Sequence, residues 1–462
     1  MKKSNLIVIP SSKSFLFVFF AALIIRMVNF FLLIPDDFNF KLEDQGAYVN
    51  LGLSMLETGR FVYDASDGYV IETARTPLYP AFLAAIWNIV DYNPWVVVFI
   101  QSVVDSVTCI VIGLISLAIT PRTFLLGGVL ASVNMNLVAS SGMILTDSLF
   151  LFLFTLFLWF TIAYLKSKNV KYLIILSLML SLSILTRPVA YYLIPILGFV
   201  FPWFLFSKKE SLSVVILHVL IFILTVSILL APIIHRNYKQ FDTISITSQS
   251  GLHLSKYLVP LALHFSEGIS YPAAVNEVKV KIETTKQDNW VDDVNNPFEV
   301  SRYESKIAIN RLFELGVFKA SYSWVVGSTL NLISSGVMVM PWVRALPHLS
   351  FYNAPGKDVM QKITNFMSDT DSRKYLLTIV VANTISLLFF IVKLFGVYFL
   401  VKHSSQYGGG WIVFFILGLI IYFLLITGPI IGVKYMLPIE PFLTVLAVVG
   451  FSKWKRFKKW TH

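Results

Sequence analysis

The stretch FLFVFFAALIIRMVNFFLLI, residues 15–34, decides the class of fold to which this chain belongs. A helix of about 20 predominantly apolar residues is long enough to cross the hydrocarbon core of a bilayer. The run is longer than the core of a signal peptide, so we expect a retained membrane anchor. Lys2, Lys3 and Lys13 precede it, and the positive-inside rule therefore predicts a cytoplasmic amino terminus.

The composition of the whole chain agrees with this first run. Of its 462 residues, 56% are hydrophobic and 14% are charged, whereas soluble domains contain roughly 45–50% apolar and 25% charged residues. This composition excludes a soluble protein, because the excess apolar surface must face lipid. The net charge of +11 is typical of cytoplasmic loops in a membrane protein, so nucleic acid is not implied. The single cysteine, Cys109, excludes a disulfide framework.

Further apolar runs predict an all-α polytopic membrane protein with about ten transmembrane helices. These runs lie at about 95–119, 124–139, 147–165, 172–186, 190–206, 212–232, 375–400, 411–430 and 434–450. The basic residues in the short connections fall on alternate turns, namely Arg122, Lys166, Lys168, Lys171, Lys208, Lys209 and Lys402. Together with the basic tail, 453–460, they are assigned to the cytoplasmic side, which also holds both termini.

Three parts of the chain follow from this topology. Residues 1–232 form an amino-terminal transmembrane module, whose first outer loop spans 35–94. Residues 233–374 form a long outer region with interfacial helices, and 375–462 hold the last transmembrane helices and the basic tail. Connections of such length are usually functional or disordered. Because the outer region contains aromatic residues and the amphipathic stretch 301–318, we expect an ordered lid.

One apolar segment, 317–342, is ambiguous. If it crossed the membrane, everything after it would invert and the basic tail would face outward. We therefore expect a helix that lies at the outer interface without crossing.

Four basic residues break the positive-inside pattern because they lie at the outer ends of hydrophobic segments: Arg75, Arg187, Arg236 and Lys434. Together they are candidates for a ring of fixed cations at the level of the outer headgroups. Such a ring suits a phosphate or pyrophosphate, since guanidinium offers paired planar donors. The alternative for each residue is that it extends to a lipid headgroup from a helix end.

Two acidic residues are predicted at the same depth as these cations. Asp44 follows the first transmembrane run, and Asp147 precedes the run that starts at 147. A carboxylate beside a phosphate pocket can accept a proton from an attacking hydroxyl group. The alternatives are that Asp44 is one more acid of an acidic loop and that Asp147 is a helix N-cap. Glu43 is a second candidate for the base.

Charges inside the predicted membrane helices form a separate group. Arg26 and Asp105 lie at similar depths in the first two runs, so we expect an ion pair that clamps these helices together. Glu440, between Pro438 and Pro441, is another intramembrane acid to which the sequence assigns no role.

The order of these elements resembles the GT-C glycosyltransferases, specifically the branch that contains protein O-mannosyltransferases and the lipid A aminoarabinose transferase. The resemblance extends along most of the chain. It rests on Asp44-x-x-x-Tyr48 with Leu56-x-x-Gly59, Arg75-Thr76-Pro77-Leu78-Tyr79-Pro80, Leu145-Thr146-Asp147-Ser148-Leu149-Phe150, Leu185-Thr186-Arg187-Pro188, residues 232–237 and Lys434-Tyr435-Met436-Leu437-Pro438. Two positions depart from the family pattern, because Gln45 stands where a Glu often follows the Asp and Lys434 stands where Arg is more usual.

The resemblance implies a GT-C bundle and a polyprenyl-phosphate-linked sugar as donor. It implies that Asp44 deprotonates the acceptor with inversion, that the four cations stabilise the departing lipid phosphate, and that Tyr48 and Tyr79 position substrate. A divalent metal is not required by this arrangement, although some relatives bind one. The acceptor, a glycan, lipid or protein, is not identified by the sequence. We expect a bacterial inner membrane location with the site on the outer side.

Two alternatives stay open. An O-antigen polymerase or ligase also pairs outward arginines with a large outer loop. A secondary transporter, from a different class, would use Arg26, Asp105 and Glu440 as a relay for coupling ions.

Overall fold

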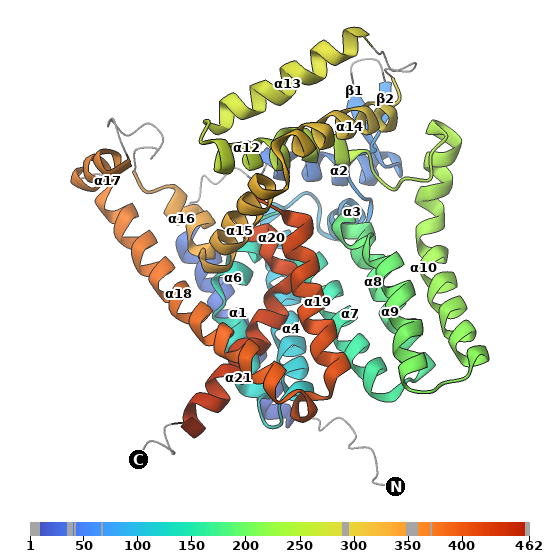
Figure 1. Cartoon of the computed structure of the whole chain (residues 1–462), viewed down its shortest axis with the longest axis vertical. Coiled ribbons are helices and arrows are strands. Elements are labelled where there is room, and N and C mark those ends of the chain that lie inside the picture. The colour runs from blue at the N-terminus through green and yellow to red at the C-terminus, as the bar shows by residue number, and fades with distance from the viewer. Residues whose placement is uncertain are drawn as a thin grey trace.

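The computed structural model describes residues 10–34, 40, 43–65, 68–288, 295–347, 359–369 and 372–457. Helices dominate these residues, and the sheet found among them is a single antiparallel pair, β1 (Val62–Ala65) with β2 (Gly68–Ile71). A bundle of long helices carries a layer of shorter, inclined helices at one end (Figure 1). The predicted all-α membrane fold is therefore confirmed.

Eight helical segments in the described residues are long and apolar enough to cross a membrane. They contain the helices α1 (Ser12–Leu33), α4 (Pro94–Ile119), α7 (Asp147–Ser167), α9 (Leu193–Ser207), α10 (Leu212–Phe241), α18 (Arg373–Lys402), α19 (Gly410–Thr427) and α21 (Glu440–Phe457). The other two predicted runs are also helical but do not pass the same test singly. Helix α8 (Val170–Thr186) has 17 residues, and the run at 124–139 is broken into two helices.

The break in that run has a polar cause. Helices α5 (Phe124–Ser132) and α6 (Met135–Ser141) meet at an angle of 55°, and the Asn134 side chain caps α6 by accepting from the backbone N–H of Asn136. The amide of Asn134 also donates to the Glu440 carboxylate at 2.7 Å, and the amide of Asn136 donates to its other oxygen. Glu440, which is 1% exposed, therefore holds the broken helix against α21.

The predicted intramembrane ion pair is confirmed. The Arg26 Nε donates to Asp105 Oδ2 at 2.5 Å, and both side chains are fully buried between α1 and α4. Arg26 also donates to the carbonyl oxygens of Ala22 and Ser132 and to the sulfur of Cys109. Because burying a charge is costly unless it is paired and hydrogen-bonded, this network makes the charge tolerable.

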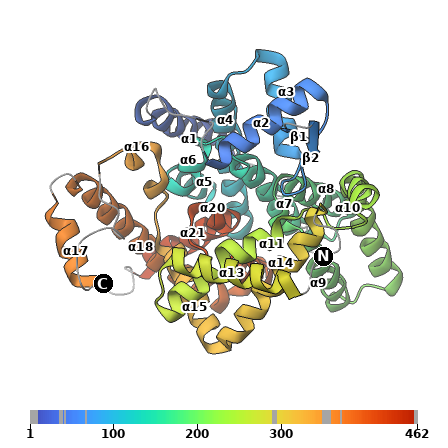
Figure 2. The same ribbon diagram turned by 90° about the horizontal axis from the view of Figure 1, so that it is seen from above.

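The layer at the end of the bundle is called the cap layer here. It consists of α2 (Glu43–Thr58), β1, β2, α3 (Leu78–Val90), α11 (Gln249–His253), α12 (Val259–Glu267), α13 (Tyr271–Asp288), α14 (Pro297–Leu315) and α15 (Val317–Ile333). Helix α1 begins and α21 ends at the opposite end of the bundle (Figure 1). Seen from above, α11, α13 and α14 lie on one side of the short helix α20 (Val433–Met436), and α2 and α3 lie on the other (Figure 2).

Ion pairs join the helices of the cap layer. Arg311 of α14 pairs with Glu277 of α13 at 2.7 Å and with Glu267 of α12 at 3.3 Å, and Lys319 of α15 reaches the same Glu267 at 3.1 Å. A π-helical turn, Leu254–Leu258, connects α11 to α12. These contacts connect α12, α13, α14 and α15 to one another. That this region acts as a lid stays a prediction.

The ambiguous segment 317–342 begins with α15, which has 17 residues and is not among the candidate membrane spans found in the described part of the chain. Ser323 donates to the carbonyl of Ala262 in α12 at 2.9 Å. Trp324 donates to the carbonyl of Leu425 in α19 at 2.9 Å, and Gly327 fits against the backbone of Pro429. Helix α15 thus lies between α12 and the end of α19. The three-part division of the chain stays a prediction.

Candidate active site

Asp44 lies between two of the predicted cations. Its carboxylate is 3.8 Å from the Arg75 guanidinium and 3.4 Å from the Lys434 ammonium. The three residues come from α2, from the segment before α3 and from α20, so sequence-distant elements bring them together. Asp44 is 58% exposed, which leaves the carboxylate accessible to a ligand.

A turn built by the sequence 72–77 fixes Arg75. The buried carboxylate of Glu72, 1% exposed, accepts hydrogen bonds from the backbone N–H groups of Ala74 and Arg75. The guanidinium then donates to the Tyr63 hydroxyl of β1 at 2.6 Å and lies 5.4 Å from the ring centre of Tyr48. Burial lowers the pKa of Arg75, but Tyr63, Tyr48, Glu72 and Asp44 raise it overall. Arg75 is therefore a permanently charged, preoriented cation.

Asp147 and Arg187 form a second pair beside the first. Arg187 Nη1 donates to Asp147 Oδ1 at 2.5 Å and to the backbone carbonyl of Lys434 at 3.3 Å. Asp147 is the first residue of α7, and Arg187 follows the last residue of α8. The shared contact with Lys434 connects this pair, in which Asp147 is buried and Arg187 is half-buried, to Asp44.

Tyr48 lies between the two ion pairs. Burial raises the pKa of Tyr48, whereas the charges of Arg75 and Arg187 lower it, so both cations are close enough to act on its hydroxyl. The Tyr48 ring meets the ring of Tyr79 edge-on, with centroids 5.3 Å apart. Tyr79 itself is fully buried, and its hydroxyl donates to Gln101 at 2.6 Å. Tyr79 thus touches the cluster through Tyr48.

Arg236 is at the edge of this arrangement. Its guanidinium donates to the Asn237 side chain and lies 5.6 Å from the ring centre of Phe61. The acid that acts on its charge is Glu72, the partner of Arg75. The structure therefore brings Asp44, Arg75, Asp147, Arg187 and Lys434 together, whereas Arg236 contacts Asn237 and Phe61 instead.

Two positions beside Asp44 bear on the predicted base. Glu43 is the first residue of α2, but its side chain is outside the described part of the structure, so its role stays a prediction. The side chain of Gln45 is buried, and its oxygen accepts from the backbone N–H of Ile144 at 2.9 Å. Gln45, which stands where a Glu often follows the Asp in the enzymes that the sequence resembles, thus fastens α2 to the connection that precedes Asp147.

Two residues beside the site were not predicted to belong to it. Glu72 could have been found, because an acid three residues before Arg75 is a turn signal. His253 of α11 had no such signal. Burial, together with the charges of Lys434 and Arg187, lowers the pKa of His253 to about 4, and its ring centre lies 6.3 Å from that of Tyr435. A neutral imidazole therefore covers the cationic cluster from the cap layer.

Metal ligation is a separate question. In the part of the chain that the structure describes, no group of three or more His, Cys, Asp or Glu side chains is arranged to hold a metal ion. The expectation that the reaction requires no metal stays a prediction.

A comparison of the sequence with protein families gives one match in the region of the site. Residues 74–235 match the model of the family described as dolichyl-phosphate-mannose-protein mannosyltransferase. This range contains Arg75, Asp147 and Arg187 and ends one residue before Arg236. A comparison with curated protein sequences gives no match.

Solved structures similar to this chain include archaeal oligosaccharyltransferases. The oligosaccharyltransferase AglB from Archaeoglobus fulgidus, solved with an inhibitory peptide and a dolichol-phosphate, is 10% identical with a TM-score of 0.52 over 95% of this chain and 50% of that chain. The apo form of the Archaeoglobus fulgidus oligosaccharyltransferase is 14% identical with a TM-score of 0.52, over 98% of this chain and 52% of that chain. ArnT from Cupriavidus metallidurans bound to undecaprenyl phosphate is 13% identical with a TM-score of 0.39, over 96% of this chain and 78% of that chain.

The chain spans about half the length of the archaeal oligosaccharyltransferases that it matches. At these identities the likeness shows the fold, which is the GT-C fold. The predicted resemblance to GT-C glycosyltransferases is therefore confirmed by the family match and by the fold.

Proposed function

We propose that this GT-C-fold protein is an integral membrane glycosyltransferase that moves a sugar from a polyprenyl-phosphate donor to an acceptor hydroxyl. One observation carries the proposal: the accessible carboxylate of Asp44 lies between the cations Arg75 and Lys434, where the cap layer meets the membrane helices. A general base and a phosphate-binding group are thus combined in one place.

The donor phosphate would be bound by Arg75 and Lys434, with Arg187 beside them. A phosphate offers oxygens in the geometry that guanidinium donors match, and charge-assisted hydrogen bonds of this kind are among the strongest. The dolichol-phosphate held by the archaeal oligosaccharyltransferase supports a lipid phosphate as the ligand. The Asp44 carboxylate lies between these cations. A bound phosphate would take over the cations and free the carboxylate.

The reaction is a single displacement. The acceptor oxygen attacks the anomeric carbon while Asp44 accepts the hydroxyl proton, and the bond between that carbon and the phosphate oxygen breaks on the opposite face. The electron pair leaves with the lipid phosphate, and the configuration at the anomeric carbon inverts. Fixed cations stabilise the charge that develops on the leaving group, and a positioned base contributes typically about 10²–10⁴ in rate.

The remaining predicted site residues take positioning roles in this proposal. Asp147 holds Arg187, so it orients a cation rather than accepting the acceptor proton. Tyr48 lies against Arg75 and can direct a hydroxyl toward substrate, whereas Tyr79 supports the Tyr48 ring. Arg236 would contact the donor at a point beyond Arg75.

We further propose that the cap layer faces the outer side of a bacterial inner membrane. Helices α7, α9 and α18 all end on the side of the bundle opposite the cap layer (Figure 1). Each of these ends carries a lysine: Lys166 in the last turn of α7, Lys208 directly after α9 and Lys402 as the last residue of α18. Basic residues gather on the cytoplasmic side of membrane proteins, so this arrangement supports an outward-facing site.

The transporter alternative depended on a relay of Arg26, Asp105 and Glu440. Arg26 and Asp105 are bonded to each other at 2.5 Å, and two asparagine amides hold Glu440. Side chains with such fixed partners favour a structural role over a relay for coupling ions.

The test is genetic complementation read by mass spectrometry. Cells that lack the protein should accumulate its lipid-linked sugar donor, which identifies the sugar. Asp44→Asn should accumulate the donor to the same extent as the deletion. Asp242→Asn is the matched control, because Asp242 is exposed at the end of α10 with φ 49°, a left-handed conformation that Asn adopts readily. Full restoration of transfer by Asp44→Asn would overturn the proposal.

A further inference from the structure

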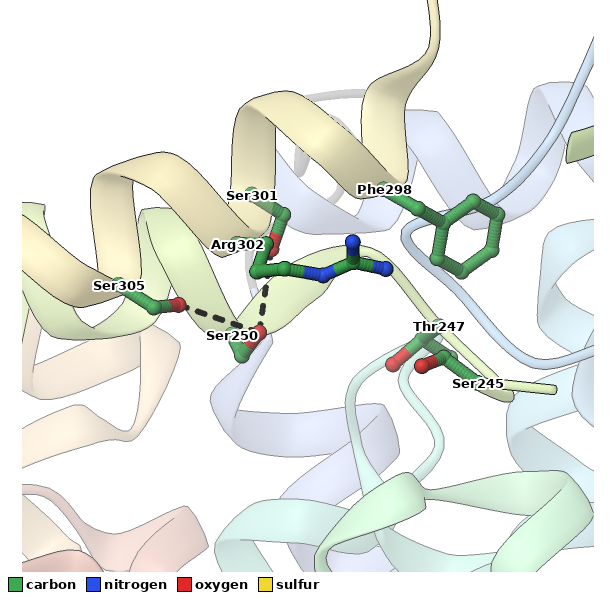
Figure 3. A pocket seen from close by; sticks show the side chains of 7 residues that line it. All are labelled: Ser245, Thr247, Ser250, Phe298, Ser301, Arg302 and Ser305. Atoms are coloured by element: carbon green, nitrogen blue, oxygen red, sulfur yellow. Dashed lines mark hydrogen bonds between the residues drawn. The ribbon is translucent and has the colours of Figure 1, made fainter. Parts of the chain in front are cut away.

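A groove of about 200 Å³ lies in the cap layer between α14 and the segment 245–250 (Figure 3). Five hydroxyl-bearing side chains line it, from Ser245, Thr247, Ser250, Ser301 and Ser305. Arg302 and Phe298 complete the wall on the side of α14. Drug-sized sites have volumes of about 300–1,000 Å³, so this smaller space suits a single sugar-sized unit.

Hydrogen bonds fix one wall of the groove. The hydroxyl of Ser301 accepts from the backbone N–H of Gly251 at 2.9 Å and lies 3.1 Å from the hydroxyl of Ser250. Ser305 donates to Ser250 at 3.4 Å. Gly251 has no side chain, and a Cβ there would lie 2.6 Å from the backbone oxygen of Ser301. The close contact between α11 and α14 thus keeps the hydroxyl groups together.

The groove borders the candidate active site. The backbone N–H of Ser248 donates to the carbonyl of Thr73 at 2.8 Å, and the two hydroxyls lie 2.9 Å apart. Thr73 is two residues before Arg75. At the other end of the segment, Asn237 donates to the carbonyl of Ser245 at 2.7 Å and accepts from Arg236. Ser245 and Ser248 are therefore fastened to Asn237 and Thr73, which lie within two residues of the cations Arg236 and Arg75 in the sequence.

Arg302 supplies the positive charge of the groove. Its side chain is exposed, and within the described residues it makes no ion pair or hydrogen bond, in contrast to Arg311 on the same helix. Figure 3 shows its guanidinium extended over the groove above Thr247 and Ser245. A guanidinium that is free to form paired hydrogen bonds favours a carboxylate or a phosphate.

We propose that this groove binds an anionic sugar of the acceptor, with Arg302 on its carboxylate or phosphate and the serine and threonine hydroxyls on its hydroxyl groups. The acceptor role rests on the proposed glycosyltransferase function. Hydroxyl side chains both donate and accept, so they match the neighbouring hydroxyls of a sugar. With the anionic end held by Arg302, the rest of the acceptor extends past Thr73 toward Asp44.

A peptide acceptor fits the same groove less well. An extended peptide gains affinity from main-chain hydrogen bonds with free backbone groups. The backbone N–H groups of Ser248 and Gly251 are already bonded, to Thr73 and Ser301. Apart from the ring of Phe298, the groove offers side-chain hydroxyls and one cation.

The first test measures binding directly, with the full chain in nanodiscs and saturation-transfer NMR. The probes are glucose 6-phosphate and glucuronate, with glucose and inorganic phosphate as comparisons. The wild type should bind both sugar anions, and Arg302→Gln should weaken that binding by about tenfold or more, equivalent to about 1.4 kcal/mol. Glucose and phosphate should each bind more weakly than glucose 6-phosphate, because each lacks half of the contacts.

Lys306→Gln is the matched control, since Lys306 is exposed on the same helix and does not line the groove. It should bind the probes as the wild type does, and Arg302→Lys should recover part of the affinity. Equal binding by the wild type and Arg302→Gln would overturn the proposal. Equal affinity for inorganic phosphate and glucose 6-phosphate would also overturn it, because the site would then read the anion alone. Binding of an acidic peptide in place of both sugars would assign the groove to a protein acceptor instead.

The binding test is independent of turnover, so the two proposals can fail separately. Asp44→Asn should bind the sugar anions normally while losing transfer. Arg302→Gln should raise the KM for the native acceptor and leave the KM for the donor unchanged. Normal transfer by Asp44→Asn would defeat the glycosyltransferase proposal, whereas an unchanged acceptor KM in Arg302→Gln would defeat the acceptor groove.

Discussion

The ammonium of Lys434 lies 3.4 Å from the carboxylate of Asp44, although 390 residues separate them in the sequence. Lys434 is on α20, a helix of four residues that interrupts the connection from α19 to α21. Asp44 is the second residue of α2. The first and last parts of the chain are therefore both needed to form the proposed site.

Removing the charge of Lys434 should weaken donor binding. Lys434→Gln leaves Arg75 as the cation in contact with Asp44, so we expect the KM for the lipid donor to rise by about tenfold, equivalent to about 1.4 kcal/mol. Lys434→Arg should retain most of the affinity, since the charge is kept. Lys239→Gln, at the exposed end of α10, is the control. An unchanged donor KM in Lys434→Gln would remove Lys434 from the phosphate site.

Asp147→Asn should disturb the site through Arg187. The substitution leaves the guanidinium of Arg187 without its buried counter-charge, and breaking a buried pair costs about 3–5 kcal/mol. We expect a lower melting temperature together with a higher donor KM, because Arg187 loses its orientation. Asp147→Glu should restore part of the donor affinity. If kcat alone fell, with stability and donor KM unchanged, Asp147 would act in the chemical step instead.

The Arg26–Asp105 pair should show strong coupling. Arg26→Met leaves a buried carboxylate and Asp105→Leu leaves a buried guanidinium, so each single change should cost about 3–5 kcal/mol of stability. The double variant should be more stable than either single variant, because no unpaired charge remains. The measurement is thermal unfolding in detergent. Strictly additive losses would argue against the clamp.

Gly396→Ala should separate two membrane helices. A Cβ at Gly396 in α18 would lie 1.9 Å from the backbone oxygen of Leu446 in α21, so the helices must move apart. Overpacking of this kind costs about 1–3 kcal/mol. Gly418→Ala in α19 is the control, since no atom lies within 4 Å of the added carbon. Equal melting temperatures for the two variants would contradict this close packing.

His253 should make the stability of the protein depend on pH. Its pKa is lowered from 6.5 to about 4 by burial and by the charges of Lys434 and Arg187, and Tyr257 and Tyr435 also face its ring. Between these two pH values the unfolded chain takes up a proton that the folded chain does not. Stability is therefore lost as the pH falls from about 6.5 to about 4.

The matching variant is His253→Gln. Its melting temperature should fall less than that of the wild type between pH 6.5 and pH 4, because the two proteins share every other titrating group. Parallel losses in both proteins would show that His253 is as accessible to protons in the fold as in the unfolded chain.

The membrane helices were predictable because each is encoded by a continuous apolar run. All ten runs are helical, including the first, residues 15–34. The bend in the run 124–139 was not predicted. At this bend Asn134 contacts Glu440, 306 residues away. A local apolar pattern cannot predict a contact with a residue so distant in the sequence.

In the candidate site, too, local sequence patterns could not predict which residues meet. Arg75, Arg187 and Lys434 stood out because cations at the outer ends of membrane helices violate a compositional rule. The rule could not separate Arg236, which lies beside Asn237 and Phe61 at the edge, from the cations that meet Asp44. Nor could it find His253, which carries no charge in the fold and follows no local pattern.

A bundle of membrane helices could be predicted from the residues alone, because hydrophobic length and the placement of basic residues are local properties of a chain in a bilayer. The same local rule identified the charges that were out of place. Which of these charges meet depends on the tertiary fold. Electrostatic contacts act over a few ångströms, and only the folded chain brings Asp44 of α2, Arg187 after α8 and Lys434 of α20 within that range of one another.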